Sequence, residues 1–111
     1  MNVIPPTDHG PLQDRMIVHV ESDFEPLMSK FMTNRKKEVV TMREALAQQD
    51  LETVRKVAHG MKGAGGRYGF DHITLMATTI EHTAKTGTSA GLAEELDRLA
   101  VYLEQVHVVF D

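Results

Sequence analysis

The sequence predicts an all-α protein, an antiparallel up-down-up-down four-helix bundle that follows an irregular N-terminal arm. Four segments place apolar residues at the spacing of a helix, and none alternates for long enough to indicate an extensive sheet. The connections between them are only a few residues long, and short connections make consecutive helices antiparallel neighbours. A chain of 111 residues is long enough for one domain.

The composition excludes several classes of protein. Hydrophobic residues make up 41% of the chain and the net charge is −4, so a general nucleic-acid-binding protein is not expected. Cysteine is absent, which excludes disulfides, a thiolate nucleophile and a cysteine zinc site. No apolar run approaches the length of a membrane span, and the first residues lack the pattern of a signal peptide. We therefore expect a cytoplasmic domain that binds neither membrane nor nucleic acid.

The N-terminal part of the chain divides into two pieces. Residues 1–15 hold three of the four prolines and show no helical period, so we interpret them as the irregular arm. Residues 16–111 are assigned to the bundle. Within them, residues 16–21 alternate well enough for a short extended piece, although a staple laid over the end of the bundle would fit equally well.

The first helix is expected to run from about Asp23 to Gln48. Ser22 and Glu25 have the spacing of a capping box, in which the two side chains satisfy backbone amides at a helix start. Its apolar stripe consists of Phe24, Met28, Phe31, Val39, Met42 and Leu46.

Three more helices follow. Asp50 is expected to cap the second helix and Asp71 the third, with a break around Gly69 between them. The apolar stripes are predicted to consist of Leu51, Val54, Ala58, Met61 and Gly65 in the second helix and of Ile73, Met76, Ala77, Ile80 and Ala84 in the third. Thr88 or Ser89 is expected to open the fourth helix. The stripe of this last helix is predicted to include Leu92, Leu96, Leu99, Leu103, Val106 and Phe110.

The second helix contains an unusual cluster of glycines around a histidine. Each interior glycine costs a helix about 1 kcal/mol relative to alanine, so the cluster needs a compensating role. Gly65 lies on the buried stripe, where it would allow close packing. Gly63 and Gly66, however, follow His59 by four and seven residues, which places them on the face of that histidine. Their bare surface would let another protein approach the imidazole closely.

The same segment is basic. Residues 53–70 contain four Lys or Arg residues and no acid. Lys62 follows His59 by three residues and Arg55 precedes it by four, so both can flank the imidazole on one face. A solvated basic face would explain the charges alone, but not the glycines and the histidine beside them. Together they favour an anionic group attached to His59.

A histidine suits reversible phosphoryl transfer. An imidazole has a reference pKa of about 6.5, so its neutral, nucleophilic form is available near pH 7. The P–N bond of a phosphohistidine is weak, and the group can therefore pass on to a carboxylate. Serine or tyrosine would hold a phosphoryl group too stably for a relay.

At these residues the chain resembles the histidine-containing phosphotransfer (Hpt) domains. The motif reads His59-Gly60-Met61-Lys62-Gly63-Ala64-Gly65, followed by Gly69-Phe70, and every anchor of the family's signature is in register. The resemblance covers about residues 16–109. It includes a helix entry similar to the family's at Asp23, Phe24 and Leu27, and a later match at Ile80, Glu81 and Ala84.

The resemblance implies roles for individual residues. His59 would be the phosphoacceptor and Lys62 would stabilise the phosphoryl oxygens. Gly69 would permit the turn after the second helix, and Glu81 would orient Lys62. The residues assigned to partner docking are Arg55, Lys56, Gly63, Gly66, Arg67 and Lys85.

The resemblance also implies the partner. It would be the receiver domain of a response regulator or of a hybrid histidine kinase, with a phosphorylatable aspartate and its own Mg²⁺. The chain itself would be a monomer without a cofactor, a metal or an ATP site, and thus a relay intermediate instead of an enzyme.

Three alternatives compete with this interpretation. A di-iron bundle needs two Glu-x-x-His motifs, but the sequence contains only one, formed by Glu104 and His107. A dimerising kinase core would need a separate ATP-binding domain, for which the chain has no room. A non-catalytic helical adaptor that docks to a signalling partner remains the second hypothesis.

Overall fold

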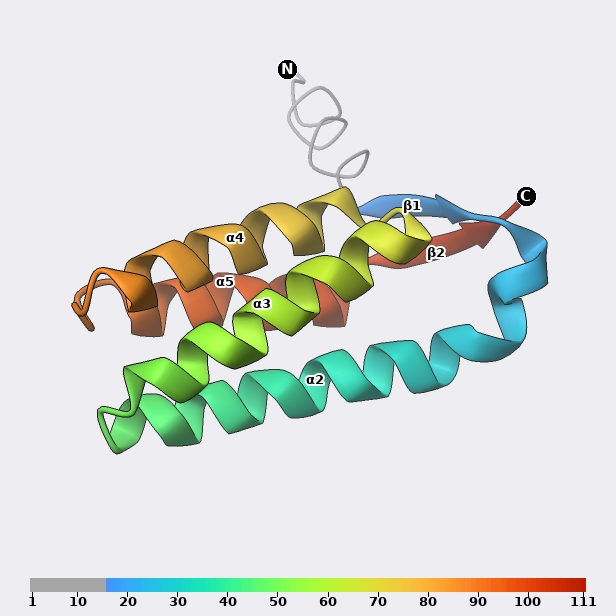
Figure 1. Cartoon of the computed structure of the whole chain (residues 1–111). Coiled ribbons are helices and arrows are strands. Elements are labelled where there is room, and N and C mark those ends of the chain that lie inside the picture. The colour runs from blue at the N-terminus through green and yellow to red at the C-terminus, as the bar shows by residue number, and fades with distance from the viewer. Residues whose placement is uncertain (1–15) are drawn as a thin grey trace, which may run out of the picture.

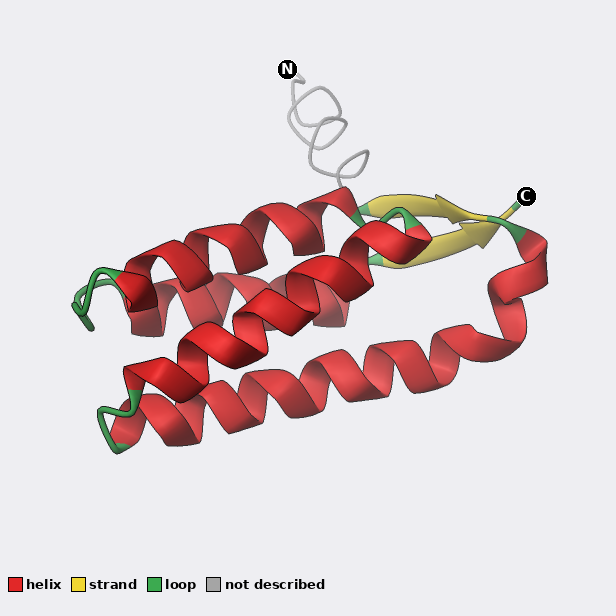
Figure 2. Cartoon of the chain, viewed as in Figure 1, coloured by secondary structure: helices red, strands yellow, loops and turns green. Residues whose placement is uncertain are grey.

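Four helices form most of the part of the chain that the structure describes. The computed structural model describes residues 16–111, so the predicted arm lies outside the described residues. The four predicted helices are confirmed, and two short strands accompany them (Figures 1 and 2). The elements are β1 (Ile17–Val20), the 3₁₀ turn η1 (Ser22–Phe24), α2 (Glu25–Ala47), α3 (Leu51–Tyr68), α4 (Asp71–Lys85), α5 (Leu92–Gln105) and β2 (His107–Phe110).

The helices lie side by side around one core. α2 packs against α3 and α5, and α4 packs against the same two helices from the other side. The chain turns back at each short connection between helices (Figure 1). The fully buried core positions follow the predicted stripes, and they include Met42, Val54, Ala58, Met61, Ile73, Ala77, Ile80, Leu92, Leu96 and Leu99.

The two strands form a parallel pair at one end of the helices (Figure 2). Ile17 pairs with His107 and Val20 with Phe110. The predicted extended piece is therefore confirmed, and Val20 at its end is buried. Pairing gives partners to backbone groups that would otherwise be left unsatisfied.

The prediction that the fourth helix continues through Phe110 is wrong. α5 ends at Gln105, and Val106 is extended with φ −67° and ψ 138°. Val106 and Phe110 continue the four-residue spacing of the helical stripe, but both are partly buried by packing against the core in the extended chain. The spacing of Val106 and Phe110 carries no information about β1, which comes from the other end of the described chain and supplies the hydrogen-bond partners of β2.

The helix starts differ in part from the predictions. Asp50 caps α3 as expected, since its Oδ1 accepts a hydrogen bond from the Thr53 amide at 3.1 Å. The capping box at Ser22 and Glu25 is not formed. Instead η1 precedes α2, whose N-cap is Phe24 without a side-chain hydrogen bond. The Phe24 ring packs edge-to-face on Tyr68 with centroids 5.0 Å apart, a contact that favours this entry.

Two further caps were assigned to the wrong residues. Asp71 is the first residue of α4, and Phe70 precedes it as the N-cap. Neither Thr88 nor Ser89 opens α5, because Gly91 is its N-cap, with φ at 82°. Glycine adopts this left-handed conformation without a steric penalty, so the chain turns into α5 two or three residues later than the predicted polar cap would place it.

Candidate functional site

One carboxylate bridges the two residues that the motif singled out. Glu81 on α4 lies with its Oε2 2.8 Å from His59 Nδ1. Its other oxygen, Oε1, accepts a hydrogen bond from Lys62 Nζ at 2.8 Å. The structure thus brings His59, Lys62 and Glu81 together across the contact between α3 and α4, which lie side by side in Figure 1.

The local folding of the two helices explains this geometry. His59 and Lys62 are three residues apart and share one face of α3. Their neighbours Ala58 and Met61 are fully buried, so the His59 and Lys62 side chains project from the edge of the core. On α4, the buried Ile80 sets Glu81 at the corresponding edge.

The electrostatics of the site centre on Glu81, whose side chain is 14% exposed. Hydrogen bonds from Lys62 and then from His59 lower the pKa of Glu81 to about 2, although burial acts in the opposite direction. The carboxylate is therefore ionised at neutral pH and can only accept hydrogen bonds. It follows that His59 Nδ1 carries the proton of this contact.

The other ring nitrogen of His59 is left on the accessible side. The His59 side chain is 63% exposed, and Glu81 occupies Nδ1. In the neutral ring, Nε2 then holds the free electron pair. The resemblance predicted that Glu81 orients Lys62, and the contact agrees with this. The hydrogen bond from His59 to Glu81 was not predicted, because it depends on how α3 and α4 are aligned along each other.

The glycines of α3 have distinct environments. A Cβ at Gly63 would meet no heavy atom within 4 Å, so this surface beside His59 is open. Gly65 packs as predicted, since a Cβ there would lie 2.9 Å from Thr74 Oγ1 and 3.0 Å from Ile73 Cγ2. Gly66 is exposed, and Gly69 ends α3 in the left-handed conformation with φ at 85°, which confirms its predicted turn.

The predicted docking cations differ in their contacts. Arg55 was expected to flank the imidazole, but its guanidinium makes a two-fold contact with Glu52, at 2.9 Å and 2.8 Å. This partner lies just outside the acid-free stretch, three residues before Arg55. Lys56, Arg67 and Lys85 are exposed. The part that any of these residues plays in docking stays a prediction.

A comparison with protein families decides the class of this domain. The family model of the Hpt domain matches residues 26–108. The chain belongs to the Hpt domain family. The match includes His59, Lys62 and Glu81, and it confirms the resemblance seen in the sequence. No curated protein and no solved structure gives a significant match.

Membership in the Hpt family carries a coarse statement of function. Hpt domains have a histidine phosphotransfer role in two-component signalling. They are phosphotransfer intermediates, not catalysts with an ATP site of their own, and they interact with receiver domains.

Other features of this Hpt domain bear on the alternatives. His107 lies in β2, so Glu104 and His107 do not share a helix face as a di-iron motif would require. Within residues 16–111, no group of three or more His, Asp or Glu side chains is arranged to hold a metal ion. No helix in the described part of the chain has both the length and the apolar composition needed to cross a bilayer.

Proposed function

We propose that this domain relays a phosphoryl group between His59 and the aspartate of a receiver domain. The receiver belongs to a response regulator or a hybrid histidine kinase, and the relay takes place in the cytoplasm on a monomeric, antiparallel up-down-up-down bundle. The observation that carries the proposal is the bridge at Glu81. It holds Nδ1 and leaves Nε2 exposed, which is the arrangement a nucleophilic imidazole needs.

The transfer step follows from this geometry. The Nε2 electron pair of His59 attacks the phosphorus of the receiver's aspartyl phosphate. A P–N bond forms, the P–O bond to the aspartate breaks, and the aspartate leaves as a carboxylate. The ring gains positive charge and keeps its Nδ1 proton, which the ionised Glu81 stabilises at 2.8 Å. Transfer to a receiver is the reverse of these events.

Lys62 acts on the phosphoryl group in this proposal. Its side chain is 35% exposed, and its ammonium group contacts the same Glu81 carboxylate as His59. From there the ammonium can turn toward the phosphoryl oxygens, to which it offers a charge-assisted hydrogen bond. The Mg²⁺ that supports chemistry at an aspartyl phosphate is supplied by the receiver and not by this chain.

The docking surface surrounds His59. The open backbone at Gly63 and the exposed Gly66 allow the rim of a receiver site to approach. Lys56, Arg67 and Lys85 complement the acidic residues that surround such an aspartate, and Arg55 contributes less because Glu52 engages its guanidinium.

The test is phosphoryl uptake from receiver domains of the same organism, phosphorylated with radiolabelled acetyl phosphate. Wild type should take up acid-labile label, and His59→Gln should take up none while keeping its fold, because His59 is exposed and leaves no cavity. His107→Gln, an exposed histidine on β2, is the matched control and should behave as wild type. Label on the His59→Gln variant would refute the proposal. Receiver binding without any uptake by wild type would favour the adaptor instead.

A further inference from the structure

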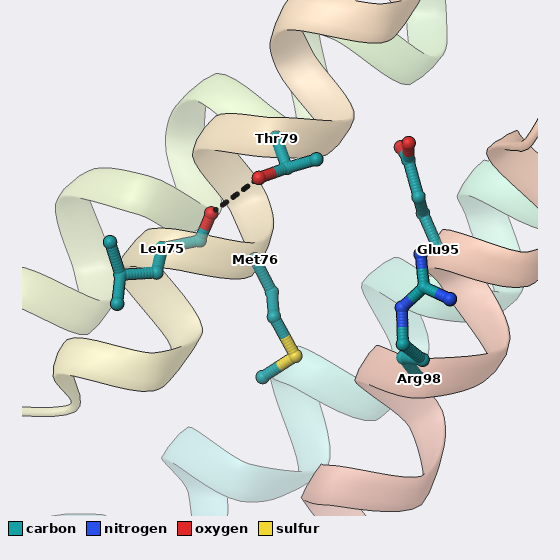
Figure 3. A pocket seen from close by; sticks show the side chains of 5 residues that line it. All are labelled: Leu75, Met76, Thr79, Glu95 and Arg98. Carbon is teal, nitrogen blue, oxygen red and sulfur yellow. Dashed lines mark hydrogen bonds between the residues drawn. The ribbon is translucent and has the colours of Figure 1, made fainter.

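Thr74 makes a hydrogen bond that its neighbours on α4 do not make. Its Oγ1 donates across the helix contact to the backbone carbonyl of Lys62 on α3, at 3.1 Å. Thr78 and Thr79 instead donate to carbonyls four residues earlier in their own helix, at 2.7 Å and 3.2 Å. Figure 3 shows the bond from Thr79 to the Leu75 carbonyl. Thr74 therefore links the two helices that carry the site.

Gly65 makes this link possible. A Cβ at Gly65 would come within 2.9 Å of Thr74 Oγ1, closer than real Cβ atoms approach other atoms. A side chain at this position would force the Thr74 hydroxyl or the helix contact to shift. The carbonyl of Lys62 has a second lone pair for this bond beyond the one used within its helix.

α4 consequently holds Lys62 at two points. Thr74 binds its backbone carbonyl, and Glu81 binds its ammonium group. These two residues of α4 are seven positions apart, or roughly 10 Å along the helix axis at the standard rise. Two contacts at this separation oppose a slide of α4 along α3, in addition to the packing between the two helices.

The contact between Glu81 and His59 depends on that register. A lysine side chain has four rotatable bonds and can follow a moving carboxylate, but an imidazole has two and cannot. Hydrogen bonds weaken steeply beyond about 3.5 Å. The His59 contact is 2.8 Å long, so a slide that lengthens it by about 0.7 Å carries it to the limit of a hydrogen bond, while the Lys62 contact could re-form.

We infer that Thr74 is a positioning residue of the phosphotransfer site: its hydrogen bond to the Lys62 carbonyl sets the helix register at which Glu81 reaches His59. The effect of Thr74 on the contact between Glu81 and the His59 ring follows from the structure and does not depend on the proposed function. The effect on transfer rests on the proposed function. Thr74 itself touches neither the reacting nitrogen nor the phosphoryl group.

The test replaces the hydroxyl by a methyl group of similar size. Thr74→Val should lose the link, and Thr74→Ser should keep it. Thr79→Val is the matched control, because it makes the same chemical change on the same helix at a hydroxyl bonded within α4. Thr74→Ala serves as a second variant without the added methyl, should valine disturb the packing near Gly65.

The primary measurement is the ¹⁵N chemical shift of the two His59 ring nitrogens, at a pH where the ring is neutral. Wild type, Thr74→Ser and Thr79→Val should show the proton on Nδ1. Thr74→Val and Thr74→Ala should show a mixture of the two tautomers, and a rise in the pKa of the Glu81 carboxyl should accompany it. Transfer from a labelled phosphorylated receiver should slow by about tenfold in the same two variants.

The outcomes distinguish the inference about Thr74 from the proposed function in phosphoryl transfer. If Thr74→Val and Thr74→Ala keep the wild-type tautomer and rate, Thr74 only packs, and the inference is overturned even if the melting temperature falls. If the tautomer changes as expected while wild type accepts no phosphoryl group, the inference stands and the proposed function fails.

Discussion

Replacement of Gly63 by glutamine tests whether the open surface beside His59 serves the partner or the fold. A Cβ at Gly63 meets no heavy atom within 4 Å, so the new side chain enters without a clash. Glutamine is a better helix former than glycine by about 0.5–1 kcal/mol. In a domain of this size that gain should raise the melting temperature by about 2–5 °C.

Transfer should nevertheless fall sharply in Gly63→Gln. The glutamine side chain would project one helical turn from His59, where a receiver must come close to the imidazole. No reacting group is lost, so a slower reaction would come from hindered approach. Melting temperature and transfer of label from a phosphorylated receiver are measured on the same sample. A wild-type transfer rate would refute the idea that Gly63 clears the approach.

Gly65→Ala is the control for the stability half of this prediction. Its Cβ would lie 2.9 Å from Thr74 Oγ1 and 3.0 Å from Ile73 Cγ2. Overpacking of this kind costs about 1–3 kcal/mol, which exceeds the gain in helix propensity. Gly65→Ala should therefore melt at a lower temperature than wild type. A fall for Gly63→Gln as well would contradict the open environment of Gly63.

Two further predictions concern the bridge at Glu81. Lys62→Ala should slow transfer about tenfold or more but leave receiver binding nearly unchanged, because its charge acts on the phosphoryl group; equal rates for variant and wild type would remove Lys62 from the mechanism. The pKa of Glu81 falls from 4.5 to about 2 on folding, so the stability it contributes is present above pH 4.5 and is lost as the pH falls toward 2. Glu81→Gln should remove that part of the acid dependence. Urea unfolding of wild type and variant at several pH values measures it, and identical pH profiles for the two proteins would contradict the prediction.

The sequence predicted the features that depend on local spacing. Apolar residues at three- and four-residue intervals located all four helices, and the polar side chain of Asp50 located a cap. The break of the helical pattern around Gly69 and the family resemblance both placed a turn there, and Gly69 does end α3 in the left-handed conformation. The histidine and lysine of the site were found together because one helix carries both.

What the sequence did not reveal depends on contacts between distant segments. β2 looked like the end of a helix because Val106 and Phe110 keep the helical interval. The bond between Glu81 and His59 arises from the register of two helices, which no local pattern encodes. The pairing of Arg55 with Glu52, by contrast, has a helical spacing of three residues, and charge patterning could have indicated it.

The parallel strands have a consequence for the order in which the domain assembles. Ile17 and His107, which pair in the register of β1 and β2, stand at opposite ends of the described chain. Closing a loop of roughly 90 residues costs about 4 kcal/mol of chain entropy, unless other contacts have already brought its ends together. The helical turns form from near neighbours and can do so first. The strand pair then closes last, and in the native protein it should open before the helices do, with its amide protons exchanging ahead of those of α3 and α4.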